Sequence, residues 1–273
     1  MRKEINMIKK SGLGLTLIAL LASASWGATI TVMQDGSGDA TSVQAALAAA
    51  SNGDTIVIGD SEVYEEDVTA GAAAELVASF TLKAAEGQTP VIRAVNQTER
   101  LGALGFPGID FMGTFFFGCQ GVVIEGITFE NMTVEANVAG LSACLALFDC
   151  SDVTVRNCTV RAAGGEGTGY PADNLGLVVG GVQTAPSGVV IEDCLIEEVN
   201  YGIAVAKLQG GTPTDPSVTI RNCTIQHCEE TGIEIDNGAP LESPDPSTIA
   251  QGEGNLLENN TIIDANTGLS LGG

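Results

Sequence analysis

The chain has 273 residues, with 34 Asp and Glu against 11 Lys and Arg, so its formal net charge at pH 7 is −23. Such an acidic surface repels polyanions, which excludes nucleic acid and anionic lipid as partners. The length suits a single elongated domain with a core of its own, and we expect it to be a monomer.

The first 24 residues have the features of a secretory signal peptide. Four basic residues precede an apolar run at 12–21, and Ala22-Ser23-Ala24 fits the small-x-small cleavage rule. The apolar run is shorter than the ~20 residues that span a bilayer. We expect cleavage after Ala24, with a second candidate cut after Gly27 and an uncleaved anchor as the alternative. The mature domain, 25–273, is then secreted, extracellular or on the cell surface, or else periplasmic.

Residues 29–68 predict a strand, a helix and a second strand. Thr29 to Met33 forms the first strand, and Thr41 or Ser42 can cap a helix that runs to about Ala50. A turn at 52–54 precedes a buried strand at 55–58. A helix at this place would cover the first coil of a solenoid and shield its open edge.

An irregular repeat runs from about residue 121 to the end. A second motif, small-apolar-x-apolar, follows each repeat segment. Stacking the units about 4.8 Å apart buries one continuous core. The sequence therefore predicts an all-β fold, a single-stranded right-handed parallel β-helix solenoid with a short N-terminal capping helix. The repeat segments start at Val123, Thr154, Val190, Thr219 and Leu256, and the second motif starts at Gly140, Gly176, Gly202, Gly232 and Gly268.

Charges and turn residues form columns when the repeats are aligned. One column alternates in sign, and we interpret its arginines as ladder partners, not as catalytic cations. A second column shows the same alternation. A third column holds residues that tolerate left-handed backbone. The first column is Glu125, Arg156, Glu192, Arg221 and Glu258; the second is Glu130, Arg161 and Glu197; the third is Gly126, Asn157, Asp193, Asn222 and Asn259.

Three of the seven cysteines, Cys158, Cys194 and Cys223, fall in one inward column that starts at Ile127 and ends at Asn260. Parallel Cβ vectors leave their Cβ atoms too far apart for a disulfide, so we expect buried free thiols. A metal site at Cys223, His227 and Cys228 is the alternative, but its spacing matches no standard zinc site. The Phe-rich stretch 106–119 either fills the core or forms an aromatic platform for sugars.

The N-terminal segment also resembles a known family. The Asp35-Gly36-Ser37-Gly38-Asp39 loop, the capping helix and Tyr64-Glu65-Glu66 are similar to the opening of pectin methylesterases, within the pectin-lyase-like β-helix proteins. This resemblance implies the fold and a carbohydrate-directed role. The catalytic motifs do not carry over: Q-D-T-L, G-H-G, N-T-D, Asp-Asp and W-x-D-H are absent, and the single histidine, His227, lies between Gln and Cys. Methylesterase, polygalacturonase and classical pectate lyase activities are therefore disfavoured.

Polysaccharide sites on such solenoids lie in a groove along the coils, walled by long loops. Here the insertions 161–175, 206–217 and 236–255 are candidate walls. Paired carboxylates suit glycoside hydrolysis or calcium binding, and a lysine could act as the base of a calcium-dependent lyase. The alternative is that these carboxylates are simply solvated. The candidate catalytic residues are Lys207, Asp173 and Asp215, the candidate substrate-binding residues are Tyr170 and Asn174, and calcium would use Asp236 and Asp173.

Two functional hypotheses follow. The protein is a polysaccharide lyase or glycoside hydrolase, or it is a non-catalytic surface, adhesion or structural module of a longer protein. The sequence stops at 271–273 within a repeat, so we expect the solenoid to be incomplete at its C-terminus.

Overall fold

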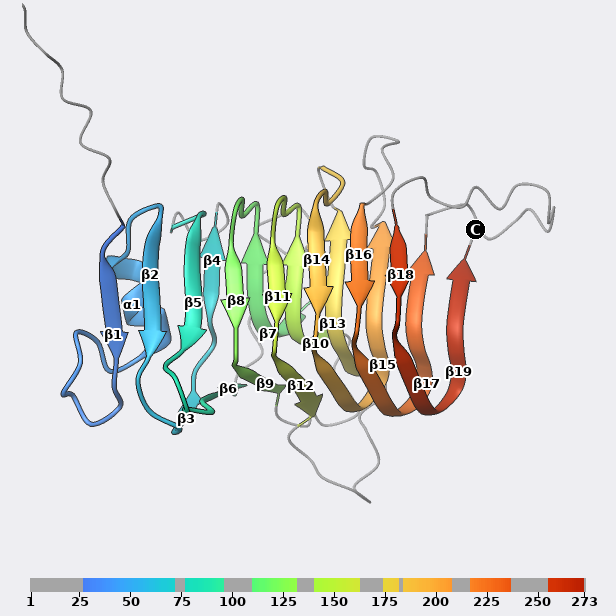
Figure 1. Ribbon diagram of the computed structural model, residues 1–273, viewed down its shortest axis with the longest axis horizontal. Helices are drawn as coiled ribbons and strands as arrows, with labels where there is room; N and C mark the ends of the chain where they lie inside the picture. Colours follow the sequence, from blue (N-terminus) through green and yellow to red (C-terminus); the bar gives the residue numbers. More distant parts are fainter. Residues whose placement is uncertain are drawn as a thin grey trace, which may run out of the picture.

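The computed structural model describes residues 27–71, 77–95, 110–131, 140–162, 174–181, 184–207, 217–236 and 255–272. Within these ranges every strand pairing is parallel, and the strands stack along one axis from the N-terminal to the C-terminal end (Figure 1). The structure is a right-handed β-helix solenoid, as predicted. No helix in the described part is long and apolar enough to cross a membrane.

One face of the solenoid is an eight-stranded sheet. Its strand order follows the chain, because each coil contributes one strand and then moves on by one layer. The strands are β1 (Thr29–Val32), β2 (Asp54–Ile58), β5 (Phe80–Ala84), β8 (Val123–Glu125), β11 (Thr154–Arg156), β14 (Val189–Glu192), β16 (Val218–Arg221) and β18 (Leu256–Glu258).

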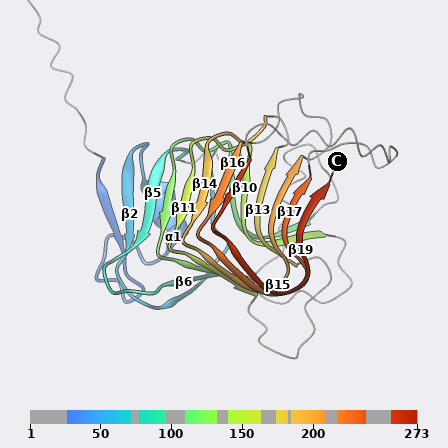
Figure 2. The same cartoon turned by 45° about the vertical axis from the view of Figure 1, so that its right-hand side comes forward.

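The second sheet supplies the other two faces. β15 (Leu195–Lys207), β17 (Thr224–Asp236) and β19 (Thr261–Gly272) are long strands that bend around a corner. The first part of β15 pairs with β12, and its last part pairs with β13 (Figure 2). The shorter strands are β3 (Val63–Glu65), β6 (Val91–Ala94), β9 (Thr128–Asn131) and β12 (Thr159–Ala162) before the corner, and β4 (Thr69–Gly71), β7 (Asp110–Phe117), β10 (Gly140–Phe148) and β13 (Asn174–Gly181) after it.

Helix α1 (Val43–Ala49) covers the first coil. The Ser42 hydroxyl accepts a hydrogen bond from the Ala45 amide at 3.1 Å and caps the helix. The Glu66 carboxylate accepts two more, from the amides of Val43 and Gln44, at 2.7 and 3.0 Å. The apolar face of the helix is fully buried, so the predicted capping helix is confirmed.

The predicted register of the main repeat is confirmed. Thr154 pairs with both Val123 and Val190, and Thr219 pairs with both Val190 and Leu256. The alternating charges therefore lie on adjacent coils. Arg156 binds Glu125 at 2.9 Å, and Nε of Arg221 binds Glu192 at 2.8 Å.

The second charge ladder is longer than predicted, since it begins at Glu65 and Arg93. Glu130 lies at its centre with a side chain only 3% exposed. It binds Arg93 on the preceding coil and Arg161 on the following coil, each at 2.8 Å. Two arginines thus offset the desolvation of one buried carboxylate.

The turn column has left-handed backbone throughout, with φ between 53° and 73° from Gly126 to Asn259. The next column faces inward, and its cysteines are at most 3% exposed. These three cysteines are buried free thiols, as expected, and the other four cysteines are also free. At the last coil Asn260 replaces the cysteine. Its side chain accepts a hydrogen bond from the Cys223 amide at 3.0 Å and donates one to the Ile220 carbonyl at 2.8 Å.

The second motif is confirmed for four coils and wrong for one. Gly176, Gly202, Gly232 and Gly268 stack, but Leu145 pairs with Leu177, so Cys144 occupies the column instead of Gly140. The pairing of β10 with β13 runs without a shift from Ser142 to Phe148, so Gly140 lies four residues before the position opposite Gly176. Cysteine is also a small residue, so this column still holds a small side chain. The Cys144 thiol lies 3.2 Å from the Arg161 carbonyl oxygen.

Three described phenylalanines of the Phe-rich stretch, Phe115, Phe116 and Phe117, fill buried space on both faces of β7. Phe116 joins the main core and meets Phe80 edge-on at a centroid distance of 5.7 Å. Phe115 and Phe117 belong to a second buried cluster with Phe148. Their burial supports the core interpretation of this stretch over an open aromatic platform.

Candidate functional site

The described backbone brings two of the six predicted site residues together. Lys207 ends β15 and pairs with Gly181, and Asp236 ends β17 and pairs with Ala206. The two residues therefore lie at adjacent strand ends on one rim of the solenoid. Asn174 begins β13, at the opposite end of the strand that Gly181 closes. At ~3.3 Å per residue, about 20 Å of strand separates it from Lys207.

The other three predicted residues, Tyr170, Asp173 and Asp215, lie outside the described residues. The calcium pair Asp236 and Asp173 is therefore placed only at its Asp236 member. All six assignments stay predictions.

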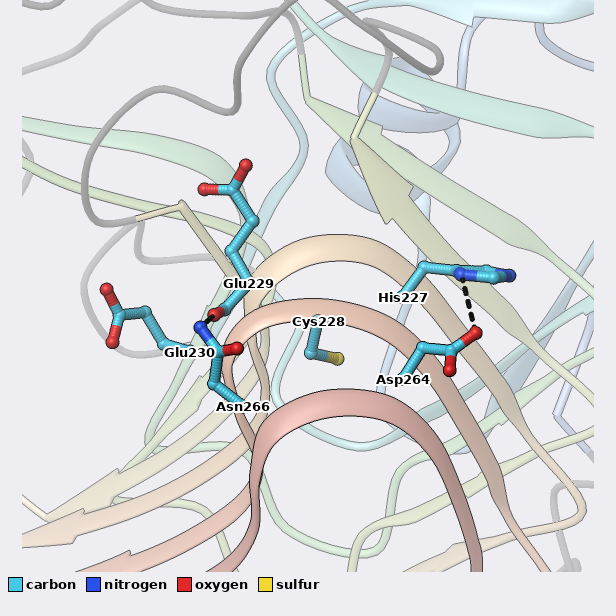
Figure 3. A pocket seen from close by; sticks show the side chains of 6 residues that line it. All are labelled: His227, Cys228, Glu229, Glu230, Asp264 and Asn266. Carbon is cyan, nitrogen blue, oxygen red and sulfur yellow. Dashed lines mark hydrogen bonds and ion pairs between the residues drawn. The ribbon is translucent and has the colours of Figure 1, made fainter.

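A recess of about 520 Å³ opens at the corner of the last two coils. It is lined by His227, Cys228, Glu229 and Glu230 of β17 and by Asp264 and Asn266 of β19 (Figure 3). The recess is on the outer surface of the bend where the long strands pass from one face to the next.

Left-handed residues make this corner. Glu198, His227 and Asp264 have φ of 57°, 53° and 53°, and their neighbours pair in register, so the three form one stack. Nδ1 of His227 lies 3.6 Å from Oδ2 of Asp264, and both side chains are about half exposed or more. The histidine is thus flanked by a carboxylate-bearing residue on each adjacent coil.

A β-bulge supplies the remaining carboxylates. Strand β17 places two residues, Glu229 and Glu230, where β15 has Asn200 and β19 has Asn266. The Asn200 amide donates to the Glu229 carboxylate at 3.1 Å, and the Asn266 amide donates to the Glu229 carbonyl. Bulges often re-aim side chains in this way. Here the bulge points both carboxylates outward, as Figure 3 shows.

Cys228 does not share this exposed surface. It is 2% exposed and belongs to the main core, and burial raises its pKa to about 11, so it stays a neutral thiol. Cys223 is buried in the same core, whereas His227 faces outward. The geometry does not support the metal alternative at these three residues. The described ranges contain no group of three or more His, Cys, Asp or Glu placed to hold a metal ion.

The recess is therefore an acidic surface that can accept hydrogen bonds from hydroxyl groups. Sequence reasoning named its histidine but missed the site. One signal could have found it: the segment 224–236 has one residue more than the stretches of β15 and β19 that pair with it. That extra residue can be recognised as a bulge only when the register of the three coils is known.

A family comparison agrees with this architecture. The right-handed β-helix region family model matches residues 98–243, which is more than half of the chain. The chain belongs to this family of right-handed β-helix proteins.

Two curated relatives are polygalacturonases. The one from Cochliobolus carbonum is 29% identical over 124 residues, which is 44% of this chain and 31% of that protein. The one from Penicillium griseoroseum is 29% identical over 89 residues, covering 31% of this chain and 24% of that protein. The chain thus matches less than a third of the length of either relative.

The solved structures that resemble the chain include the pectin methylesterase from Aspergillus niger in two deglycosylated forms. These are 13% and 14% identical to the chain, with a TM-score of 0.39 for each. The alignments cover 88% of this chain and 87% of that one.

Proposed function

We propose that this protein binds or cleaves a pectic polysaccharide outside the cell. The observation that carries the proposal is the similarity of part of the chain to two polygalacturonases. The backbone pairing of β13, β15 and β17 supports it, because Lys207 and Asp236, a basic and an acidic residue, then end neighbouring strands. In a hydrolase, Asp236 would be one of the two carboxylates that the reaction needs.

The surface charge sets the conditions for this function. A chain with a net charge of −23 repels a polyuronate, so binding needs either cationic side chains or a bridging cation. Calcium prefers carboxylate ligands and could bridge the two anions through Asp236. The activity or binding is then expected to fall when calcium is chelated with EDTA.

A non-catalytic binding or adhesion module is the second candidate. Two observations favour it: the polygalacturonase motifs G-H-G and N-T-D are absent, and the described arginines are engaged in ladder ion pairs. Lysines are few among the described residues, so a lyase mechanism with a lysine base would depend mainly on Lys207. This candidate predicts glycan binding without products.

Secretion is part of the proposal and rests on the N-terminal sequence. Export with cleavage after Ala24 would leave a mature chain with seven basic and 33 acidic residues, a net charge of −26. The intact mass of the exported protein tests this directly, because a chain that retains residues 1–24 contradicts it.

The decisive experiment compares variants at the rim with a remote control. Lys207→Ala and Asp236→Asn should each reduce turnover of polygalacturonate, or its binding if no product forms, by tenfold or more, about 1.4 kcal/mol. Glu62→Gln removes an exposed carboxylate near the first coil and should change neither. Full activity in both rim variants would show that the rim is not the site.

A further inference from the structure

Three of the buried thiols form a continuous column inside the solenoid. The strands on both sides of the turn stay in register over three coils, so Cys158 lies next to Cys194 and Cys194 lies next to Cys223. Each of the three is at most 3% exposed and belongs to the main core. The proposed polysaccharide site uses none of them.

The three thiols have the same orientation. Each sulfur lies near the carbonyl oxygen of the residue two positions before it, at 3.2 Å for Cys158 and Cys194 and 3.4 Å for Cys223. The sulfurs of Cys194 and Cys223 also lie 3.7 Å from a carbonyl oxygen on the preceding coil. Because one orientation repeats with the coils, adjacent sulfurs are separated by about the 4.8 Å between stacked strands.

The middle thiol interacts with both of its neighbours in the column. Its interaction with Cys158 is the largest cause that raises the pKa of Cys194 to about 12, and Cys223 acts on it from the other side. The three sulfurs are therefore near enough to one another to share a ligand.

The position does not require cysteine for packing. One coil earlier it holds Ile127, which is 1% exposed, and one coil later it holds Asn260, which bonds back to the Cys223 amide. A larger apolar side chain and a polar one are both accommodated. Size and burial alone therefore do not explain three consecutive cysteines.

The linear arrangement restricts the ligand that these thiols can hold. Thiolates select soft metals, chiefly copper(I), zinc and iron–sulfur clusters. Structural zinc and iron–sulfur clusters need four protein ligands around one centre. A straight column offers two sulfurs to any one point, and the described ranges hold no group of three or more ligands placed around a metal ion.

Copper(I) fits this arrangement because it accepts two ligands in a line. Two metal–sulfur bonds of about 2.3 Å, the length that zinc has, would span about 4.6 Å. That distance is close to the ~4.8 Å between adjacent coils, so an ion fits between two stacked sulfurs without moving the strands apart.

We propose that the column of Cys158, Cys194 and Cys223 binds copper(I), with each ion held between the sulfurs of two adjacent coils. The ion forms a bond to one sulfur and displaces the proton of that thiol to solvent, so the charge of the core does not change. The neighbouring thiol supplies a sulfur lone pair as the second ligand, and no electron is transferred. Neutrality favours this exchange, because an unpaired charge in an apolar core is costly.

A cation can reach the column from the surface. Exposed turn residues, Asn157, Asp193 and Asn222, directly precede the three cysteines. Local opening of one turn therefore uncovers a thiol without unfolding the coil. The net charge of −23 also raises the concentration of cations near the protein.

The middle position of the column provides the test. In Cys194→Ser the two remaining thiols, Cys158 and Cys223, lie two coils apart, at about 9.6 Å, which is too far to share an ion. Cys228→Ser is the matched control. It also removes one buried thiol, but the neighbours of Cys228 on the adjacent coils are Val199 and Ala265.

One further pair of thiols is the same in both variants. Cys119 and Cys150 interact with each other on earlier coils, and neither substitution touches them. Copper held by that pair therefore cancels when the two variants are compared.

The measurement is a titration of the reduced full chain with copper(I) under nitrogen, in competition with a chromophoric copper(I) chelator. The wild type and Cys228→Ser should each hold at least about one copper ion per chain more than Cys194→Ser. X-ray absorption at the copper edge should show sulfur neighbours only. Equal copper content in Cys194→Ser and Cys228→Ser, or nitrogen and oxygen neighbours around the metal, would overturn the proposal.

A second pair of variants keeps the test valid if Cys194→Ser does not fold, which circular dichroism before copper addition will show. Cys158→Ser with Cys223→Ser leaves a single thiol in the column, whereas Cys144→Ser with Cys228→Ser removes two thiols elsewhere. The first should lose the copper of the column and the second should keep it. Copper retained by the first double variant would contradict the proposed site.

Discussion

Replacing one glycine of the stacked column with alanine should show how much the close packing of adjacent coils contributes to stability, apart from the effect of alanine on the backbone. In Gly202→Ala the new Cβ would lie 2.4 Å from the Gly232 carbonyl oxygen and 2.6 Å from Cγ2 of Ile225. Neither neighbour can yield, because one is backbone and the other is a fully buried core side chain. The coils must move apart, and overpacking of this kind costs about 1–3 kcal/mol.

Gly268→Ala is the matched control. The position has the same place in the repeat, but the added Cβ meets nothing within 4 Å. Its main effect is the lower entropy of the unfolded chain, which stabilises by about 0.4–1 kcal/mol. Gly202→Ala gains the same term, so the two variants should differ by about 1–3 kcal/mol in the free energy of unfolding.

Equilibrium urea denaturation followed by circular dichroism measures this difference, provided that the m-value is unchanged. The reasoning predicts a lower midpoint for Gly202→Ala and an equal or higher one for Gly268→Ala. Equal midpoints for the two variants would refute the stacked corner as a steric constraint.

Three further predictions concern charge, thiols and the last coil. Glu130→Gln should lower the free energy of unfolding by about 2–3 kcal/mol, because two arginines lose their buried partner. Glu65→Gln, in an exposed pair, should lower it by less than about 0.5 kcal/mol. Equal losses for the two variants in urea denaturation would contradict this. Burial raises the pKa of Cys144 to about 12 and of Cys228 to about 11, above 9.0 for an ordinary thiol. Under reducing conditions stability should therefore be complete below pH 9 and fall as the pH rises towards 11, and a flat profile of unfolding free energy would exclude this linkage. Asn260→Ala removes two hydrogen bonds to the preceding coil and should cost about 1 kcal/mol; an unchanged thermal midpoint would show that they contribute nothing.

The fold could be predicted from the sequence because stacking imposes the same requirement at every coil. The turn residues from Asn157 to Asn259 adopt left-handed backbone, and the alternating Glu and Arg need partners of opposite charge on the adjacent coils. Both the register of the coils and their inward faces could therefore be predicted from the sequence. The prediction that Gly140 belongs to the glycine column was wrong, because Cys144 occupies that place. Cysteine is small enough for the column although it is not glycine. Small size, not residue identity, is what the corner selects.

The site was harder to predict because its residues repeat nowhere. The bulge at Glu229 and Glu230 depends on a one-residue difference among three coils. The pairing of His227 with Asp264 depends on the register of β17 and β19 before that bulge. The rim position of Lys207 and Asp236 was accessible from the sequence only as two loop ends. Their adjacency comes from the pairing of β13, β15 and β17.

The most direct test of the proposed function is incubation of the purified protein with polygalacturonate, with calcium and with EDTA, followed by mass spectrometry of the products and by a binding measurement on the intact polymer. The account predicts unsaturated or hydrolysed oligosaccharides, or else saturable binding without products, and a lower signal in EDTA. Neither products nor binding under any condition would contradict a pectic polysaccharide as the ligand of this β-helix.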